Sequence, residues 1–466
     1  MLFNSFHFIY FFFAITIVYY QLPHKFRWVL LLAGSYYFYM NWKPVYALLI
    51  LFSTFTTYLF ALGIEKSEKD KQRKFYLYLS VLINFSILFV FKYFNFINQS
   101  VYDGLTVLHI RWPVPNLDLL LPVGISFYTF QAVGYSIDVY RGEIKAEKHF
   151  GIYALFVSFF PQLVAGPIER AKNLLPQFKS KVIFDVDNIS SGMQKALWGF
   201  FIKLVIADRA AIYVDAIYNH VEFHTSLSFI LATFIFAIQI YCDFAGYSLI
   251  AIGCAEILGF SLMINFRRPY FAPTITDFWR RWHISLSTWF KDYVYIPLGG
   301  NRKGSARTYF NLFTTFVVSG LWHGANWTFV IWGGLHGFYQ VVEKFFKTNT
   351  PSKQPLLRFI YYVITMALVM IAWVFFRANS IGDALLIFRS FFHLKTTVFL
   401  DKTTLFYLFV GVLVLVGVEA IQEFAPRLVS IWKQHYPVRF FAYVCLSLLI
   451  LLIGVFDGGQ FIYFQF

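Results

Sequence analysis

The sequence predicts an all-α polytopic membrane protein, and three observations support this. The 466-residue chain is 59% hydrophobic, its mean hydropathy is +0.60, and only 14% of its residues are charged. Soluble domains contain about 25% charged residues, so the composition excludes a soluble enzyme, a disordered protein and a fibrous repeat. The apolar residues form long continuous runs rather than short alternating segments, which excludes an outer-membrane barrel. Helices remain, because they satisfy their backbone hydrogen bonds internally in lipid.

The aromatic and basic residues fit the same class. Phe 60, Tyr 31 and Trp 12 make the chain 22% aromatic, and Tyr and Trp concentrate at bilayer interfaces. The net charge of +15 comes from Lys and Arg spread through short loops, which favours the positive-inside pattern over nucleic-acid binding. The three cysteines have no metal-ligand spacing. Because Met1–Phe6 contains no Lys or Arg and no small-residue cleavage site follows, we expect a first membrane segment rather than a cleaved signal.

Twelve apolar runs are candidate membrane segments, and we expect roughly 10–12 spans with additional re-entrant pieces. No internal repeat stands out, which argues against a transporter of two inverted halves. The runs are His7–Gln21, Trp28–Met40, Val45–Ile64, Phe75–Phe96, Leu119–Val139, Ile152–Val164, Ala196–Tyr218, Ser226–Phe260, Tyr309–Val342, Phe359–Phe376, Leu405–Ile421 and Phe440–Phe456.

Loop charges predict the orientation of the chain. The basic loops Glu65–Lys74 and Ala425–Arg439 are expected in the cytoplasm, whereas Asn98–Asp118 and Asn219–Thr225, which carry few or no basic residues, are expected outside. The N-terminus and residues 457–466 would then both be extracytoplasmic.

The segment Asn265–Arg307 is anomalous, because it is polar, basic and Trp-rich between two apolar regions. Its prolines interrupt any continuous helix. Such segments are tolerated at membrane depth only inside protein or along a water-filled cavity, so we expect the chemistry here.

Within it, Thr276–Phe290 is predicted as one helix, with Thr276 as N-cap and Asp277 in the first turn. His283 lies beside an apolar stripe, and Arg280 lies one turn earlier. The segment is interpreted either as an interfacial amphipathic helix or as a helix that presents His283 and its arginines to a polar substrate. The stripe consists of Trp279, Trp282, Leu286 and Trp289.

A second group of candidate residues lies in Ser319–Gly337, where His323 and Asn326 share a helix face. A membrane-buried histidine is costly, and a neutral imidazole can take a proton from a hydroxyl at physiological pH. We therefore expect His323 to act as a general base, the alternative being a helix–helix hydrogen bond. For His336 the packing role is the stronger expectation.

Other site types have weaker support. A three-histidine metal site of His283, His323 and His336 lacks close ligand spacing, so we expect no metal. No G-x-S-x-G elbow indicates a serine hydrolase. The loop Gly299–Lys303 is either a phosphate-binding turn or a basic cytoplasmic turn.

The last ten residues read DGGQFIYFQF. They are interpreted as an aromatic interfacial anchor or as a tail that returns to the cavity and offers the Tyr463 hydroxyl as a nucleophile. A phenol of pKa about 10 becomes reactive only when a base such as His323 takes its proton.

These stretches together resemble the membrane-bound O-acyltransferase family, in its bacterial branch that modifies polysaccharides. The resemblance rests on RRPYFAPTITDFWRRWHISLSTWFKDYVYIPLGGNR and GLWHGANWTFVIWGGLHG, with further likeness in FVSFFPQLVAGPIER and YCDFAGYSLIAIG. It implies a ring of membrane helices around a thin core with a central tunnel. We therefore expect one membrane-embedded domain over residues 1–466, with a catalytic core at 265–337.

The resemblance also implies roles for individual residues. His323 matches the family's catalytic histidine, and His283 matches the second histidine of the bacterial branch. The tail FIYFQF resembles that of a small partner protein in D-alanylation, whose tyrosine is proposed to relay the acyl group, so Tyr463 is expected as a relay. The substrate contacts are expected from Arg280, Arg281, Asn326, Trp322, Trp282, Asn301 and Arg302.

The expected function is transfer of an acetyl group from a cytoplasmic thioester, acetyl-CoA or another acyl donor, to an extracytoplasmic polysaccharide. No bound cofactor is expected. An extracytoplasmic acyltransferase partner would complete the transfer, and the chain would lie among the lipids of a bacterial cytoplasmic membrane. The alternatives are D-alanyl or other acyl transfer to a cell-wall polymer, direct acylation of lipid or protein and, more distantly, transport of an acyl donor.

Overall fold

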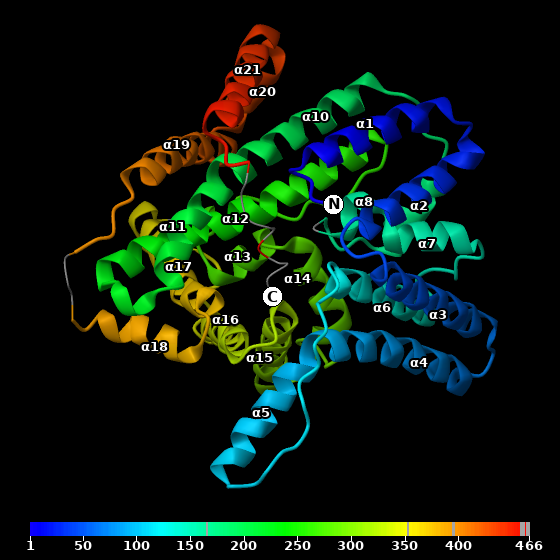
Figure 1. The fold of residues 1–466 in the computed structure, drawn as a ribbon, viewed down its shortest axis with the longest axis horizontal. Coiled ribbons are helices and arrows are strands. Elements are labelled where there is room, and N and C mark those ends of the chain that lie inside the picture. The colour runs from blue at the N-terminus through cyan, green and yellow to red at the C-terminus, as the bar shows by residue number, and fades with distance from the viewer. Residues whose placement is uncertain (165, 352–353, 394–396, 457–461, 463–466) are drawn as a thin grey trace. The chain divides into compact units, whose positions relative to one another are not determined.

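The protein is described here from a computed structural model of residues 1–466. The described residues are all of these except 165, 352–353, 394–396, 457–461 and 463–466. Every regular element among the described residues is helical (Figure 1), so the predicted all-α class is confirmed.

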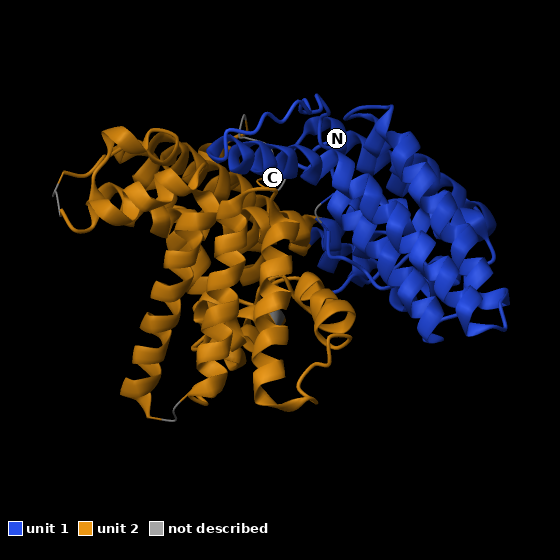
Figure 2. Ribbon diagram, turned by 90° about the horizontal axis from the view of Figure 1, so that it is seen from below, with its two compact units in different colours: residues 1–193, 251–263 blue, residues 194–250, 264–466 orange. Residues whose placement is uncertain are grey.

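The chain forms two compact units, coloured separately in Figure 2. The first contains Met1–Met193 and Ala251–Met263, and the second contains Gln194–Ile250 and Ile264–Phe466. Helices α10 (Val186–Phe201) and α12 (Ser226–Ile257) contribute residues to both units. The segment 265–337 lies entirely in the second unit.

The first unit is built from short and medium helices with buried polar contacts between them. Asn84 of α4 accepts a hydrogen bond from Ser53 of α3 at 2.6 Å and donates one to Thr57 at 2.9 Å, which satisfies its side chain within an apolar bundle. The elements are α1 (Phe6–Gln21), α2 (His24–Met40), α3 (Tyr46–Lys66), α4 (Asp70–Leu88), the π-turn η1 (Phe89–Tyr93), α5 (Phe94–Val107), α6 (Ile125–Arg141), α7 (Phe150–Ser158), α8 (Phe160–Leu163) and α9 (Ala171–Lys179).

The second unit carries both histidine motifs. Its elements, besides α10 and α12, are the π-turn η2 (Ile202–Ala207), α11 (Asp208–Tyr218), η3 (Val221–Phe223), η4 (Pro269–Phe271), α13 (Ile275–Arg281), α14 (Ile284–Phe290), η5 (Lys291–Tyr295), α15 (Gly304–His323), α16 (Trp327–Phe345), α17 (Pro355–Arg377), α18 (Ile381–Ser390), α19 (Lys402–Phe424), α20 (Pro426–Gln434) and α21 (Tyr436–Ile453).

Six helical segments in the described part of the chain are long and apolar enough to cross a membrane. They are Tyr46–Lys66, Asp70–Val107, Ser226–Ile257, Pro355–Arg377, Lys402–Phe424 and Tyr436–Ile453. The chain is therefore a multi-pass membrane protein. Several other predicted runs form shorter or broken helices, such as Ile152–Val164, which α7 and α8 divide at Phe159.

The apolar run Tyr309–Val342 is not one continuous membrane segment as predicted. It forms a hairpin of α15 and α16 that turns at Gly324–Asn326. Glycines allow the two helices to pack backbone to backbone. A Cβ atom on Gly320 would collide with the Phe329 carbonyl oxygen, and one on Gly333 would collide with the Phe316 carbonyl oxygen. The hairpin places His323 at the end of one helix rather than inside a long one.

Candidate active site

The segment that carries His283 folds as two short helices with a break between them. Thr274, not Thr276, caps α13 by accepting the Asp277 N–H at 3.0 Å. The helix ends at Arg281, and α14 begins at Ile284. The predicted continuous helix Thr276–Phe290 is therefore wrong. At the break the backbone pairs instead with the preceding segment: the Arg267 N–H donates to the Arg281 carbonyl, and the Ile284 N–H donates to the Asn265 carbonyl, each at 2.9 Å.

His283 occupies this break in a left-handed backbone conformation, with φ of 43°. A side chain other than glycine in this region is strained, and such residues cluster at functional sites. The His283 side chain is fully buried, and its ring lies edge-on to the Phe244 ring at a centroid distance of 4.5 Å. The break therefore holds an imidazole inside the second unit.

Asn265 fixes the protonation pattern of His283. Its side-chain oxygen lies 3.1 Å from His283 Nδ1 and also accepts the Ser285 N–H at 3.3 Å and the Ser285 hydroxyl at 3.0 Å. A backbone N–H only donates, so the accepting atom is the amide oxygen and His283 carries its proton on Nδ1. Burial lowers the pKa of His283 to about 3, so the ring is neutral and its Nε2 is a hydrogen-bond acceptor.

His323 is the last residue of α15, and its side chain is only 2% exposed. Aromatic rings surround it, with centroids of Trp332, Trp322 and Phe376 at 4.9, 5.0 and 5.6 Å. The His283 ring lies 6.3 Å away, centroid to centroid. The two motifs, which are forty residues apart in the sequence, thus bring two imidazoles together in one apolar cluster.

A cavity of about 510 Å³ is lined by chain neighbours of both histidines, although neither His283 nor His323 itself lines it. Ile284, the neighbour of His283 in the chain, lines it, as does Ser319, which lies one helical turn before His323 on α15. Two basic side chains, Arg280 and Lys291, also line it. The cavity therefore combines positive charge and hydroxyl groups with walls that adjoin both histidines. The remaining hydroxyl-bearing residues of the lining are Thr276, Ser287, Thr288, Tyr295 and Thr315.

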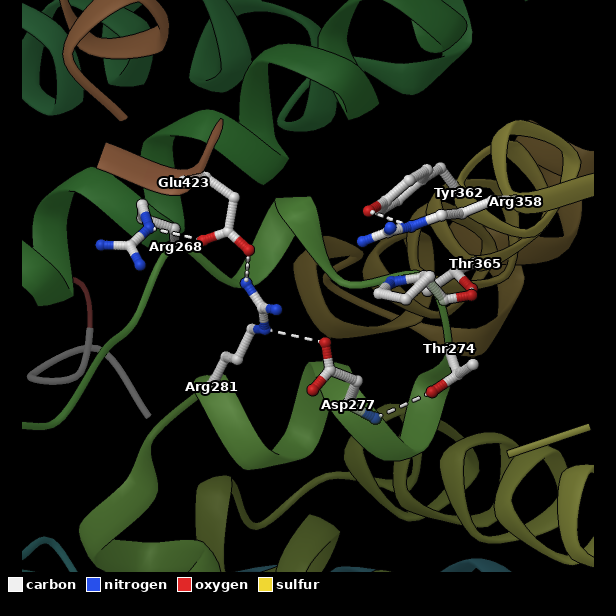
Figure 3. A network of polar contacts seen from close by, with 9 residues as sticks. Arg268, Thr274, Asp277, Arg281, Arg358, Tyr362, Thr365 and Glu423 are labelled. Atoms are coloured by element: carbon white, nitrogen blue, oxygen red, sulfur yellow. Dashed lines mark hydrogen bonds and ion pairs between the residues drawn. The ribbon is translucent and has the colours of Figure 1, made fainter. Parts of the chain in front are cut away.

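Arg281, next to Arg280 in the chain, is committed to ion pairs instead (Figure 3). Its guanidinium lies 2.8 Å from Asp277 and 2.9 Å from Glu423 of α19, and Glu423 also pairs with Arg268 at 2.7 Å. This network ties the segment before α13, and α13 itself, to the end of α19. Arg281 does not line the cavity.

The other predicted substrate contacts occupy varied positions. Asn326 caps α16 by accepting the Thr328 N–H at 3.0 Å. Trp282 is fully buried and stacks on Phe278, so it packs the core. Asn301 and Arg302 lie exposed in the turn after η5 and do not line the cavity. Of the predicted group, Trp322 lies near both imidazoles and Arg280 lines the cavity. Tyr463 lies outside the described residues.

The third histidine, His336, lies inside α16 and is fully buried. Its Nδ1 accepts the indole N–H of Trp279 at 3.2 Å. Among the residues that the structure describes, no group of three or more His, Cys, Asp or Glu side chains is arranged to hold a metal ion.

Two kinds of supporting residue were missed in the sequence. Asn265 orients His283, but its partner lies 18 residues away, and only its polarity at the edge of an apolar run marks it. Glu343 of α16 accepts the Thr276 N–H at 2.9 Å at the start of α13, and burial raises its pKa. Ionisable residues buried in apolar runs are rare and functional by default, which is the signal that could have found the buried Lys203, Asp208 and Asp243 and the half-buried Glu343.

Comparisons with known proteins identify the family. The model of the membrane-bound O-acyltransferase family matches residues 148–385. The chain is 38% identical to the probable alginate O-acetylase AlgI of Pseudomonas aeruginosa over 421 residues, which cover 89% of this chain and 80% of that protein.

Two further relatives have related names. The chain is 38% identical to the peptidoglycan O-acetyltransferase of Helicobacter pylori over 391 residues, covering 77% of this chain and 72% of that protein. It is 28% identical to the teichoic acid D-alanyltransferase of Bacillus subtilis over 242 residues, which cover 50% of this chain and 61% of that protein. The chain belongs to the membrane-bound O-acyltransferase family and is an O-acyltransferase.

Proposed function

We propose that the protein transfers an acetyl group from a thioester donor towards hydroxyl groups of an extracytoplasmic polysaccharide of the alginate or peptidoglycan type. The relatives that cover most of the chain are named for O-acetylation of such polymers. The observation that carries the proposal is the pair of buried imidazoles with ring centroids 6.3 Å apart beside a basic cavity. Acyl transfer from a thioester needs a base and a water-poor site, and this cluster offers both.

His323 would act as the general base. It would take the proton from the attacking hydroxyl while the oxygen attacks the thioester carbonyl, and it would return that proton to the departing thiolate as the C–S bond breaks. The products are an acetyl ester and a free thiol. The apolar rings around His323 would exclude water, so that the acetyl group is transferred rather than hydrolysed.

The tautomer of His283 favours a role as hydrogen-bond acceptor over one as a donor that stabilises the tetrahedral oxyanion. Its Nδ1 proton is engaged by Asn265, so Nε2 accepts hydrogen bonds and cannot donate to an oxyanion in this state. His283 would orient the attacking hydroxyl or His323. The indole N–H of Trp322, whose ring lies 6.1 Å from that of His283 and 5.0 Å from that of His323, is one candidate donor to the oxyanion. The indole N–H of Trp332, whose ring lies 4.9 Å from that of His323, is another.

The donor would enter the cavity lined by Arg280 and Lys291. Guanidinium and ammonium groups bind the phosphates of acetyl-CoA or of a phosphopantetheine carrier. We assign this side to the cytoplasm of a bacterial inner membrane, because moving a charged donor across the bilayer would be very costly. The sequence of steps requires no bound cofactor.

The first acceptor would be Tyr463, on an extracytoplasmic C-terminal tail. Its phenol would gain the acetyl group with His323 as base, and a hydroxyl of the polysaccharide, presented by an extracytoplasmic acyltransferase partner, would then take the acetyl group and restore the phenol. Each step exchanges one ester or thioester for another, so no further reactant is needed.

The test uses purified full-length protein and acetyl-CoA labelled in the acetyl group. Wild type is compared with His323→Ala, with Tyr463→Phe and with the control His220→Ala, which changes an exposed loop histidine. The readouts are label on the protein and release of free CoA. We expect label on wild type and on the control, and none on the first two variants.

The outcomes separate the rival functions. CoA release that survives Tyr463→Phe but not His323→Ala would keep the acyltransferase and discard the relay. A D-alanyl thioester used in preference to acetyl-CoA would favour D-alanyl transfer, the alternative to which the Bacillus relative points at lower identity and coverage. Uptake of the donor without CoA release, unaffected by His323→Ala, would indicate transport.

A further inference from the structure

The chain that follows α21 returns to the π-turn η2. The Val455 N–H donates to the Leu204 carbonyl at 2.9 Å, and the Arg209 guanidinium donates to the Ile453 carbonyl at 2.6 Å, where α21 ends. A π-turn departs from the regular α-helical pattern of backbone hydrogen bonds, and such turns are frequent at functional sites. The last described residues are thus fixed to the α10–α11 region of the same unit.

The same π-turn carries a buried charge cluster. The ammonium nitrogen of Lys203 lies 2.6 Å from a carboxylate oxygen of Asp208 and 2.6 Å from one of Asp243 on α12. The three side chains are 1%, 3% and 5% exposed. One cation faces two carboxylates, so the cluster has acceptor capacity left for another donor.

The chain end supplies that donor. Asp243 bonds Lys203 through Oδ1, and its Oδ2 accepts the Ile462 N–H at 2.7 Å. Ile462 is itself buried, with 4% of its surface exposed. A hydrogen bond from a backbone amide to a carboxylate is charge-assisted, and the low-dielectric surroundings strengthen it.

This anchor lies beside the histidine pair along α12. Phe244, the residue after Asp243, contacts the His283 ring at a centroid distance of 4.5 Å. Ser248, one turn further on, accepts a hydrogen bond from Asn265, which in turn holds His283 Nδ1. One stretch of α12 therefore holds both the tail and the first histidine. In the sequence, Tyr463 directly follows Ile462.

We propose that Asp243, supported by Lys203 and Asp208, is a positioning residue that docks the C-terminal tail through the Ile462 amide and so presents Tyr463 to the histidine pair. The proposal rests on the proposed relay for its purpose, but the docking itself stands on the contacts above.

The test measures tail exposure and acetyl transfer separately. A probe cysteine is introduced by Gln465→Cys in a Cys445→Ser background, since Cys242 and Cys254 are buried, and its rate of maleimide labelling is followed in the full-length protein. Ile462→Pro removes the amide donor and leaves the charge cluster intact. Ile462→Val keeps the donor and is its matched control. Asp243→Asn weakens the acceptor, and Thr233→Val, a buried hydroxyl on the same helix, is the control for it.

We expect Ile462→Pro and Asp243→Asn to label at least about tenfold faster than wild type, because a hydrogen bond to a charged group is worth a tenfold change in equilibrium or more. Both controls should label like wild type. Acetylation of Tyr463 should fall by at least the same factor in the first two variants. If Asp243→Asn does not fold, Ile462→Pro decides alone.

Unchanged labelling in Ile462→Pro would overturn the docking. Faster labelling with undiminished acetylation of Tyr463 would overturn the positioning role. If wild type forms no acetyl-tyrosine at all, the relay fails, whereas the labelling rates still decide whether Asp243 holds the tail.

Discussion

The three buried histidines of the second unit occupy two different kinds of position. His283 lies at the break between α13 and α14, and His323 is the last residue of α15, whereas His336 lies in the middle of α16. The centroids of the first two rings lie 6.3 Å apart, with the rings edge-on to each other. The ring of His336 accepts a hydrogen bond from Trp279 and is packed among Trp332, Trp279 and Tyr339.

The difference shows what a helix end contributes to a membrane site. In a helix interior the backbone bonds are used up locally, so a histidine there interacts only through its side chain. At the break, the backbone of residues 281–284 bonds to Asn265 and Arg267, and the same asparagine then holds the His283 ring. Irregular backbone inside a membrane protein is costly, and here it fixes the orientation of a reactive group.

Among the residues that support the two histidines, the largest effect should come from Asn265→Leu. This change removes the acceptor for His283 Nδ1 and for both Ser285 donors. We expect acetyl transfer to fall by about 100-fold, because a small misplacement of a catalytic group costs that much. The matched control is Ser248→Ala, which removes the acceptor of the Asn265 amide group, leaves the amide oxygen in place for His283 and Ser285, and should retain most of the activity. If Asn265→Leu loses no more acetyl transfer than Ser248→Ala does, the orientation of His283 is unimportant for the reaction.

Much of the fold follows from the sequence because hydropathy alone decides it. Runs such as Tyr46–Lys66 and Ser226–Ile257 are long and apolar, so only helices can satisfy their backbones in lipid. The two histidine motifs are recognisable because His and Asn in an apolar, glycine-rich setting are otherwise costly. The structure brings both histidines into one cluster, and their catalytic roles stay predictions.

The helix break at His283 escapes sequence reasoning because local preferences run through it. Residues 276–290 keep a helical apolar stripe, and a left-handed histidine is unfavourable on its own. Pairing with Asn265 and Arg267 compensates, and that pairing is not local. Likewise, Arg280 and Arg281 differ by about 100° around a helix, so their roles depend on Glu423, which lies 142 residues from Arg281.

The second-largest effect is a loss of folding stability at acidic pH. Burial disfavours the charged form of His283 and lowers its pKa to about 3 in the folded protein. In the unfolded chain its pKa is about 6.5. Between these values the unfolded chain binds the extra proton, so stability is lost as the pH falls below 6.5. We expect His283 alone to contribute about 2 kcal/mol of loss between pH 7 and pH 5. Thermal unfolding of wild type and His283→Gln over this range would check it: the variant should show a shallower slope, and identical slopes would contradict the prediction.

The neighbouring arginines provide a smaller, more specific comparison. Arg280→Gln removes a positive charge from the cavity and should raise the KM for the thioester about tenfold, with an unchanged melting temperature. Arg281→Gln breaks the pairs with Asp277 and Glu423, and should instead destabilise the protein by about 1 kcal/mol with little change in KM. Kinetics and thermal unfolding of the two variants should therefore show opposite patterns. The reverse pattern would indicate that the thioester donor binds near Arg281 and Glu423 rather than in the cavity.

The smallest effect on activity should come from His336→Phe. A phenyl ring nearly fills the same space but cannot accept the Trp279 N–H, which would remain buried without a partner at a cost of about 1 kcal/mol. We expect a lower melting temperature and acetyl transfer within about threefold of wild type, since His336 would hold a cavity wall through Trp279 rather than move a proton. His336→Gln, which can still accept from Trp279, should recover part of the stability. A loss as deep as that of His323→Ala would mean that the position of a histidine in a helix interior does not exclude it from the reaction, and the contrast between helix end and helix interior would then fail.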